Sequence, residues 1–317
     1  VMFNSRKRLG VLFSFISLLL LGFMPIISNS RPLHISALNF ALYLSIWQLI
    51  FSTPVLLIEL RSNNKGIFAA DLSDRLKRKT AIIILITGAM FGISTFAYVL
   101  SMEKAGSVGA AIALQAYPLF AIILEAAFLK KKKRLNELFF TMILIIGLFY
   151  LVTQGTWQID ELSIWFGLAL CVPLIWSIAH ISLREVLNRT PITPVQVTFF
   201  RVLISSIIIF SISFTVHGLD EIINPLRNST FQVFASLMGL VYYLELISWF
   251  YAVRHIDVSL ASSITTPWPI ITMVLATIFL HDSIESYQII AMLLVIMSVY
   301  GILYSGRRNS RLIITNN

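Results

Sequence analysis

Three ionisable residues interrupt stretches of this sequence that are otherwise apolar: His180, Arg201 and Glu245. A charged residue at the centre of a membrane helix costs about 2.5–3.5 kcal/mol on insertion scales, and such residues usually face a cavity or a partner. Tyr242, Glu245 and Trp249 follow a helical spacing and therefore share one face. A carboxylate flanked by aromatic rings can hold an amine by charge while the rings add cation–π contact, so Glu245 is the first candidate for substrate binding.

Two other roles are open for Glu245. A carboxyl group inside a membrane protein can take up and release a proton, which would couple transport to a proton gradient. Alternatively, Glu245 pairs with Arg201, because the two residues lie at similar depths on successive apolar stretches. His180 shares a helical face with Trp176 and can titrate near neutral pH. A hydrogen-bonded histidine that only packs the core fits the same position.

Uncharged residues complete the candidate binding set: Gln115, Tyr117, Trp176, Thr265 and Trp268. Pro118, Pro267 and Pro269 stand beside four of them, and proline removes a backbone donor while its ring clashes one turn back. Carbonyl groups freed in this way are tolerated in a membrane where they line a cavity or meet hydroxyl groups. We therefore expect the three prolines to interrupt helices beside a binding site. A plain kink that improves packing is the alternative.

The elements that must position these residues are membrane helices. The chain has 317 residues, of which 57% are hydrophobic and 12% are charged, whereas soluble proteins carry about 25% charged residues. A spanning helix needs about 20 mostly apolar residues. Ten runs meet this criterion: 9–28, 37–58, 80–101, 107–129, 136–153, 162–183, 195–216, 231–253, 258–280 and 286–305. The runs are continuously apolar rather than alternating, so we predict an all-α membrane protein with ten transmembrane helices and not a barrel.

An internal repeat divides these helices into two sets. Residues 96–129 align without gaps with residues 247–280 at an offset of 151, and Pro118 then meets Pro269. The repeat unit contains five helices, and an odd number places the second copy upside down relative to the first. We therefore predict two inverted five-helix repeats, 1–154 and 155–317. Inverted repeats with paired helix interruptions are typical of secondary transporters.

The distribution of charge predicts the orientation in the membrane. The net charge is +9. With ten spans and both termini cytoplasmic, 20 Arg and Lys residues fall inside, 3 fall outside and 1, Arg201, lies within a span. This is the positive-inside pattern, so we attribute the basic clusters to contact with the lipid bilayer and not to nucleic acid. We expect an integral, multi-pass protein of the plasma membrane with cytoplasmic N- and C-termini.

Several short segments resemble those of one transporter family. They are Tyr117-Pro118-Leu119-Phe120, Trp268-Pro269-Ile270-Ile271, residues 170–185 and Phe200-Arg201. On these segments the chain resembles EamA-type members of the drug/metabolite transporter superfamily over about residues 9–305. The first repeat departs from the family pattern, because Gly22-Phe23 replaces Trp-Gly-Ser and Gln48 stands where Arg201 stands in the second. The resemblance implies ten helices around a shared cavity and alternating-access transport of a small metabolite, but it does not identify the substrate.

These observations favour a secondary transporter over an enzyme. No catalytic, metal-binding or cofactor-binding motif is present, and Cys171 is the only cysteine. One deep anion and one deep cation suit an amino acid, and Glu245 among aromatic residues suits an organic amine or cation. A nucleotide-sugar or sugar-phosphate exchanger is the alternative, and an intramembrane enzyme or sensor is a remote one. The partners we expect are a small-molecule substrate, the bilayer and, as one option, protons, in a monomer or homodimer.

Overall fold

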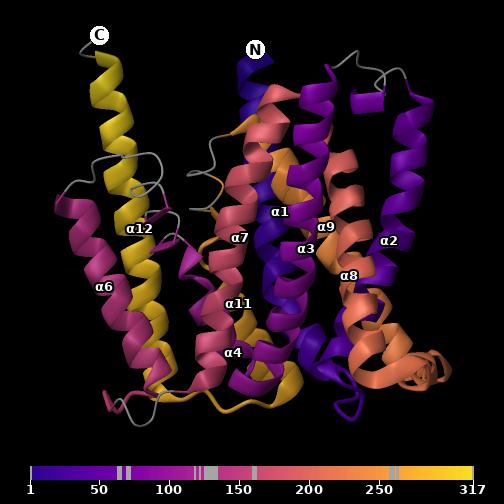
Figure 1. Ribbon diagram of the computed structural model, residues 1–317. Coiled ribbons are helices and arrows are strands. Elements are labelled where there is room, and N and C mark those ends of the chain that lie inside the picture. Colours follow the sequence, from indigo (N-terminus) through magenta and orange to yellow (C-terminus); the bar gives the residue numbers. More distant parts are fainter. Residues whose placement is uncertain are drawn as a thin grey trace.

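The computed structural model describes residues 2–62, 66–68, 73–117, 119–120, 123–124, 135–158, 163–256, 261 and 264–315. Within these ranges the regular structure is entirely helical, and the helices form one elongated bundle (Figure 1). Both chain termini lie at the same end of the bundle, which we call the terminal end. The other end is called the opposite end.

The described α-helices follow the chain in a simple order. They are α1 (Met2–Ser30), α2 (Ala37–Arg61), α3 (Asp74–Ala105), α4 (Ser107–Leu114), α6 (Leu135–Val152), α7 (Ile164–Arg189), α8 (Pro194–Ile223), α9 (Ser229–His255), α11 (Trp268–Leu275) and α12 (Ser286–Thr315). Eight of them are long and apolar enough to cross a membrane: α1, α2, α3, α6, α7, α8, α9 and α12. The chain is therefore an integral, multi-pass membrane protein.

The two other predicted spans, 107–129 and 258–280, are interrupted where they are described. Helix α4 ends at Leu114, and residues 115–116 form a turn. Thr266 and Pro267 form the corresponding turn before α11, and 115 and 266 differ by the offset of 151 found in the sequence. Pro118 lies outside the described residues, whereas Pro269 occupies the first turn of α11, where a missing N–H leaves no hydrogen bond unmade. Helix α11 continues into a π-helical turn, Ala276–Leu280.

Side-chain caps define the starts of several spans. The Ser36 hydroxyl accepts a hydrogen bond from the Asn39 N–H at 3.2 Å at the start of α2. Thr193 and Gln196 form a reciprocal capping box at the start of α8. Such caps stabilise a helix by about 1 kcal/mol because they satisfy N–H groups that have no partner within the helix. They fix where each helix enters the bundle.

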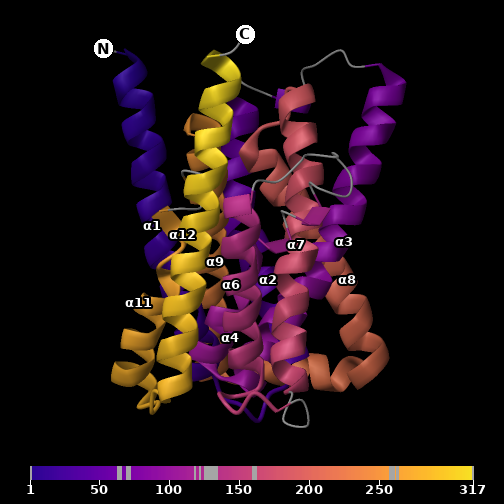
Figure 2. The same cartoon turned by 90° about the vertical axis from the view of Figure 1, so that its left-hand side faces the viewer.

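The packing of the bundle repeats itself between its halves. Helix α1 lies along α9, and α3 lies along α7; α2 also packs on α9, and α8 packs on α3. Helices α6 and α12 form a pair of their own, side by side in both views (Figures 1 and 2). Helices α2 and α9 pack tightly at Gly239, where an added Cβ would lie 2.8 Å from the carbonyl oxygen of Leu44. A side chain at that position would push the two helices apart.

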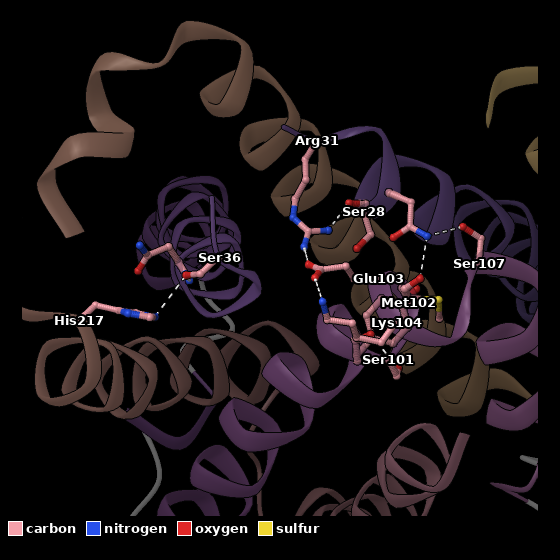
Figure 3. Close-up of polar contacts among 12 residues, drawn as sticks. Ser28, Arg31, Ser36, Ser101, Met102, Glu103, Lys104, Ser107 and His217 are labelled. Atoms are coloured by element: carbon pink, nitrogen blue, oxygen red, sulfur yellow. Dashed lines mark hydrogen bonds and ion pairs between the residues drawn. The ribbon is translucent and has the colours of Figure 1, made fainter. Parts of the chain in front are cut away.

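A buried polar cluster ties three helices together at the opposite end (Figure 3). Arg31 follows α1 and is 2% exposed, and it forms an ion pair with Glu103 at the end of α3. Lys104 contacts the same carboxylate at 3.0 Å, and the Arg31 guanidinium lies 4.9 Å from the ring centre of Phe40 on α2. Burial lowers the pKa of Arg31, and the charge of Glu103 opposes this effect. The cluster therefore depends on Glu103 for the neutralisation of a buried cation.

Candidate functional site

A cavity of about 120 Å³ lies among helices α1, α3, α4, α7, α8, α9 and α11. All ten candidate residues from the sequence line it: Gln115, Tyr117, Trp176, His180, Arg201, Tyr242, Glu245, Trp249, Thr265 and Trp268. They come from both halves of the chain and from both interrupted segments. The lining also includes six residues that the sequence did not single out: Leu21, Met24, Phe91, Leu114, Leu246 and Thr266.

The carboxylate of Glu245 is held from α1. Glu245 is 7% exposed, and its Oε1 accepts a hydrogen bond from the Ser17 hydroxyl at 2.8 Å. In the described part of the chain, Glu245 has no ion-pair partner within 4.0 Å. The direct pairing of Glu245 with Arg201, one of the roles open from the sequence, is therefore absent from this structure. Its physical reason is the packing of the bundle, because α8 lies mainly on α2 and α3 whereas α9 lies mainly on α1 and α2.

Arg201 is held by aromatic rings rather than by an acid. Its guanidinium carbon lies 3.6 Å from the ring centre of Phe91, and Nη2 donates a hydrogen bond to the Tyr242 hydroxyl at 3.2 Å. The residue is 4% exposed. Its Nη1 is buried and has no hydrogen-bond acceptor among the described residues. The side chain thus presents a fixed cation with one donor group unsatisfied.

His180 lies within a shell of aromatic residues. Its ring centre is 5.4 Å from that of Phe91 and 6.4 Å from that of Phe250. Its Nδ1 lies 3.4 Å from the Tyr117 hydroxyl, a contact that joins α7 to the residue just before Pro118. This arrangement agrees with a packing histidine that also borders the cavity.

Trp176 belongs to a second aromatic layer. Its indole N–H donates a hydrogen bond to the Ser94 hydroxyl at 3.1 Å. The ring of Tyr98 stacks on Trp176, with centres 6.2 Å apart, and also faces Tyr242 at 6.5 Å. Neither Ser94 nor Tyr98 carried a distinguishing signal in the sequence. Together they contact Trp176 and Tyr242, two rings that line the cavity.

The second interrupted segment is attached to α1. The Thr272 hydroxyl donates a hydrogen bond to the Gly22 carbonyl at 3.0 Å. A Cβ at Gly22 would lie 2.5 Å from a methyl carbon of Ile271, so the absence of a side chain permits this close contact. Trp268 is 6% exposed and borders the cavity one turn before Thr272. Helix α1 therefore supports both the Glu245 helix and the Trp268 helix.

Comparison with known proteins agrees with this architecture. A solved crystal structure of another protein superposes with a TM-score of 0.61 at 15% identity, covering 92% of this chain and 96% of that chain. At 15% identity this similarity shows a shared fold alone. No curated protein matches the sequence. The model of the EamA-like transporter family matches residues 8–153 and again residues 163–304. With both halves matched, this chain belongs to the EamA-like transporter family.

Proposed function

We propose that this protein is a secondary transporter that moves a small metabolite across the plasma membrane by alternating access. The observation that carries the proposal is the cavity within the bundle, where Glu245 and Arg201 are both buried and not paired with each other. Unpaired opposite charges inside a membrane protein mark solute or ion pathways, because each is costly without a partner.

Two inverted repeats of five helices, 1–154 and 155–317, are part of this proposal. The turns at 115–116 and 266–267 fall at equivalent positions of the two segments, and the packing of α1 on α9 parallels that of α3 on α7. Both termini lie at the same end of the bundle, which supports an even number of crossings. In the proposed ten-span arrangement the terminal end is cytoplasmic, because it then carries most of the Arg and Lys residues.

Amino acids and organic amines are the favoured substrates. Arg201 is the single arginine or lysine among the described residues that line the cavity. A sugar phosphate or nucleotide sugar carries more negative charge, and binding it would call for further cations. Typical ligand pockets measure roughly 300–1,000 Å³, so a cavity of about 120 Å³ favours a small solute. Protons are the proposed coupling ion, with Glu245 as the carrier.

A ligand screen tests the proposal directly. Purified protein in detergent is heated with amino acids, amines, nucleosides, nucleotide sugars and sugar phosphates, and solutes that raise the melting temperature are then tested for uptake into proteoliposomes. A ligand at 100 times its Kd stabilises the folded protein by about 2.7 kcal/mol, so binding is readily seen. We expect saturable uptake of an amino acid or amine. Stabilisation by phosphates alone would favour the sugar-phosphate alternative, and uptake no greater than that of empty liposomes for every solute would overturn the proposal.

A further inference from the structure

We propose that Arg201 forms a carboxylate-binding subsite in the cavity, and that the transported solute is an amino acid rather than a simple amine. This inference rests on the transport function proposed above and narrows its substrate class. It is carried by the Nη1 of Arg201, a buried donor that has no hydrogen-bond acceptor among the described residues and belongs to a side chain that lines the cavity.

The positive charge of Arg201 is buried and only partly compensated by its neighbours. Moving an ion out of water has an effective penalty of several kcal/mol, even after a protein relaxes around it. The Phe91 ring at 3.6 Å and the Tyr242 hydroxyl at 3.2 Å offset part of this penalty, but a desolvated cation–π contact contributes only about 2 kcal/mol. No acidic residue of the described chain lies within ion-pair distance of Arg201. An anion from outside the protein completes the neutralisation.

The shape of the Arg201 side chain suits a carboxylate. A guanidinium group is planar and presents its donors as a rigid fork that matches a carboxylate. The guanidinium carbon of Arg201 lies 3.6 Å from the ring centre of Phe91, and Nη2 donates a hydrogen bond to the Tyr242 hydroxyl, so two contacts hold the group in place. Nη1 is then the donor that is left for a ligand. The site is therefore preorganised for one small planar anion.

The charges that line the cavity favour a carboxylate over a phosphate. Glu245 lines the same cavity and repels a second negative charge, while no further arginine or lysine lines it within the described residues. A monoanion that also carries a cation meets both charges favourably. The ammonium group then lies toward Glu245 and the rings of Trp249 and Trp268, and the carboxylate lies toward Arg201. An α-amino acid has this pair of charges.

The experiment compares amino acids with derivatives that lack the negative charge. The probes are L-phenylalanine, L-methionine and L-lysine, each tested beside its carboxamide by thermal shift and by competition for uptake. We expect the wild-type protein to bind the acid at least about 30-fold more tightly than the amide, the ratio that corresponds to loss of one buried charge-pair partner, about 2 kcal/mol. Arg201→Gln should abolish this preference, and Arg201→Lys should retain part of it. Arg227→Gln, at an exposed position outside the cavity, should keep the full preference.

The outcomes separate this inference from the proposed function. Equal affinity for acid and amide in the wild-type protein, or an unchanged preference in Arg201→Gln, would overturn the subsite and leave a transporter of amines. If the Arg201 variants do not fold, judged by size-exclusion chromatography and circular dichroism, the comparison of acid and amide in the wild-type protein decides. Absence of uptake for every solute would reject the transport function, and the substrate assignment with it.

Discussion

The hydroxyl of Ser17 donates a hydrogen bond to the carboxylate of Glu245 at 2.8 Å and so joins α1 to α9 across 228 residues of sequence. The bond lies inside the membrane-spanning part of both helices. Glu245, the acceptor of this bond, also lines the cavity. Ser17 is therefore a positioning residue for the acid that we propose binds substrate.

Replacing Ser17 with alanine should weaken both the fold and transport. Hydrogen bonds between membrane helices contribute about 0.6 kcal/mol on average and about 1.7 kcal/mol at most, so we expect Ser17→Ala to lower the free energy of unfolding by about 0.5–1.5 kcal/mol. Ser14→Ala is the matched control, because the Ser14 hydroxyl bonds to the Gly10 carbonyl of its own helix. Unfolding in detergent and uptake into proteoliposomes measure the two effects. Equal behaviour of the two variants would show that the bond to Glu245 has no consequence.

Glu245→Gln should remove transport without removing the fold. The amide oxygen can still accept the Ser17 hydrogen bond, but the negative charge is lost, and we expect uptake to fall about 30-fold or more, as for loss of a buried charge partner. Glu137→Gln is the control, because Glu137 is 5% exposed at the start of α6 and does not line the cavity. Uptake at the wild-type rate in Glu245→Gln would contradict a role for the carboxylate in binding or in proton coupling.

Gly239→Ala should separate α2 from α9. The added Cβ would lie 2.8 Å from the Leu44 carbonyl and 3.1 Å from the Gln48 nitrogen, which are backbone atoms that cannot move alone. Overpacking of this kind costs about 1–3 kcal/mol. Gly167→Ala on α7 is the control, since its added Cβ would meet no atom within 4 Å. Thermal melting in detergent should show a loss for Gly239→Ala alone, and no such loss would mean that the helices adjust freely.

Removing the anion of the opposite-end cluster should be costly. Glu103→Leu leaves the Arg31 cation buried without a counter-ion, which costs about 3–5 kcal/mol for a buried pair. Lys104→Gln tests the exposed partner, whose side chain is 44% exposed, and should cost about 0–1 kcal/mol. The double variant Arg31→Met with Glu103→Leu should recover most of the stability that is lost in Glu103→Leu, because no buried cation is then left without a counter-ion. A double variant that is no more stable than Glu103→Leu would show that the ion pair is not the source of the loss.

The polar residues of the site were predictable because apolar helices make them conspicuous. A glutamate, an arginine or a histidine inside an apolar run usually faces a cavity or contacts a polar partner. All ten candidate residues line one cavity. Phe91 was not predictable, since nothing separates it from the other 22 phenylalanines of the chain. Ser17 was missed for a similar reason, because most serines in these helices bond to their own backbone, as Ser14 does.

For the fold as well, the sequence predicts the helices themselves but not which helices pack against each other. Hydropathy identified the eight helices that are long and apolar enough to span a membrane. Of the three prolines expected to interrupt helices, Pro267 lies in the turn before α11, Pro269 lies within the first turn of α11, and Pro118 lies outside the described residues. Similar depth on successive helices predicted contact between Arg201 and Glu245. Similar depth gives only the position of each residue along its helix. Helices α8 and α9 pack mainly on different neighbours, so residues at the same depth need not meet.

The contacts of α1 impose an order on the biosynthesis of the protein. Ser17 meets Glu245, 228 residues later, and the Gly22 carbonyl meets Thr272, 250 residues later. Translation adds about 5–20 residues per second, so roughly 10–50 s pass between the synthesis of the α1 residues and that of these partners. During that interval the Ser17 hydroxyl can instead bond to a carbonyl of the preceding turn of α1. The contacts of α1 are thus completed by residues translated 228 and 250 positions after their partners, so a nascent chain cut short before residue 245 would lack both partners of α1.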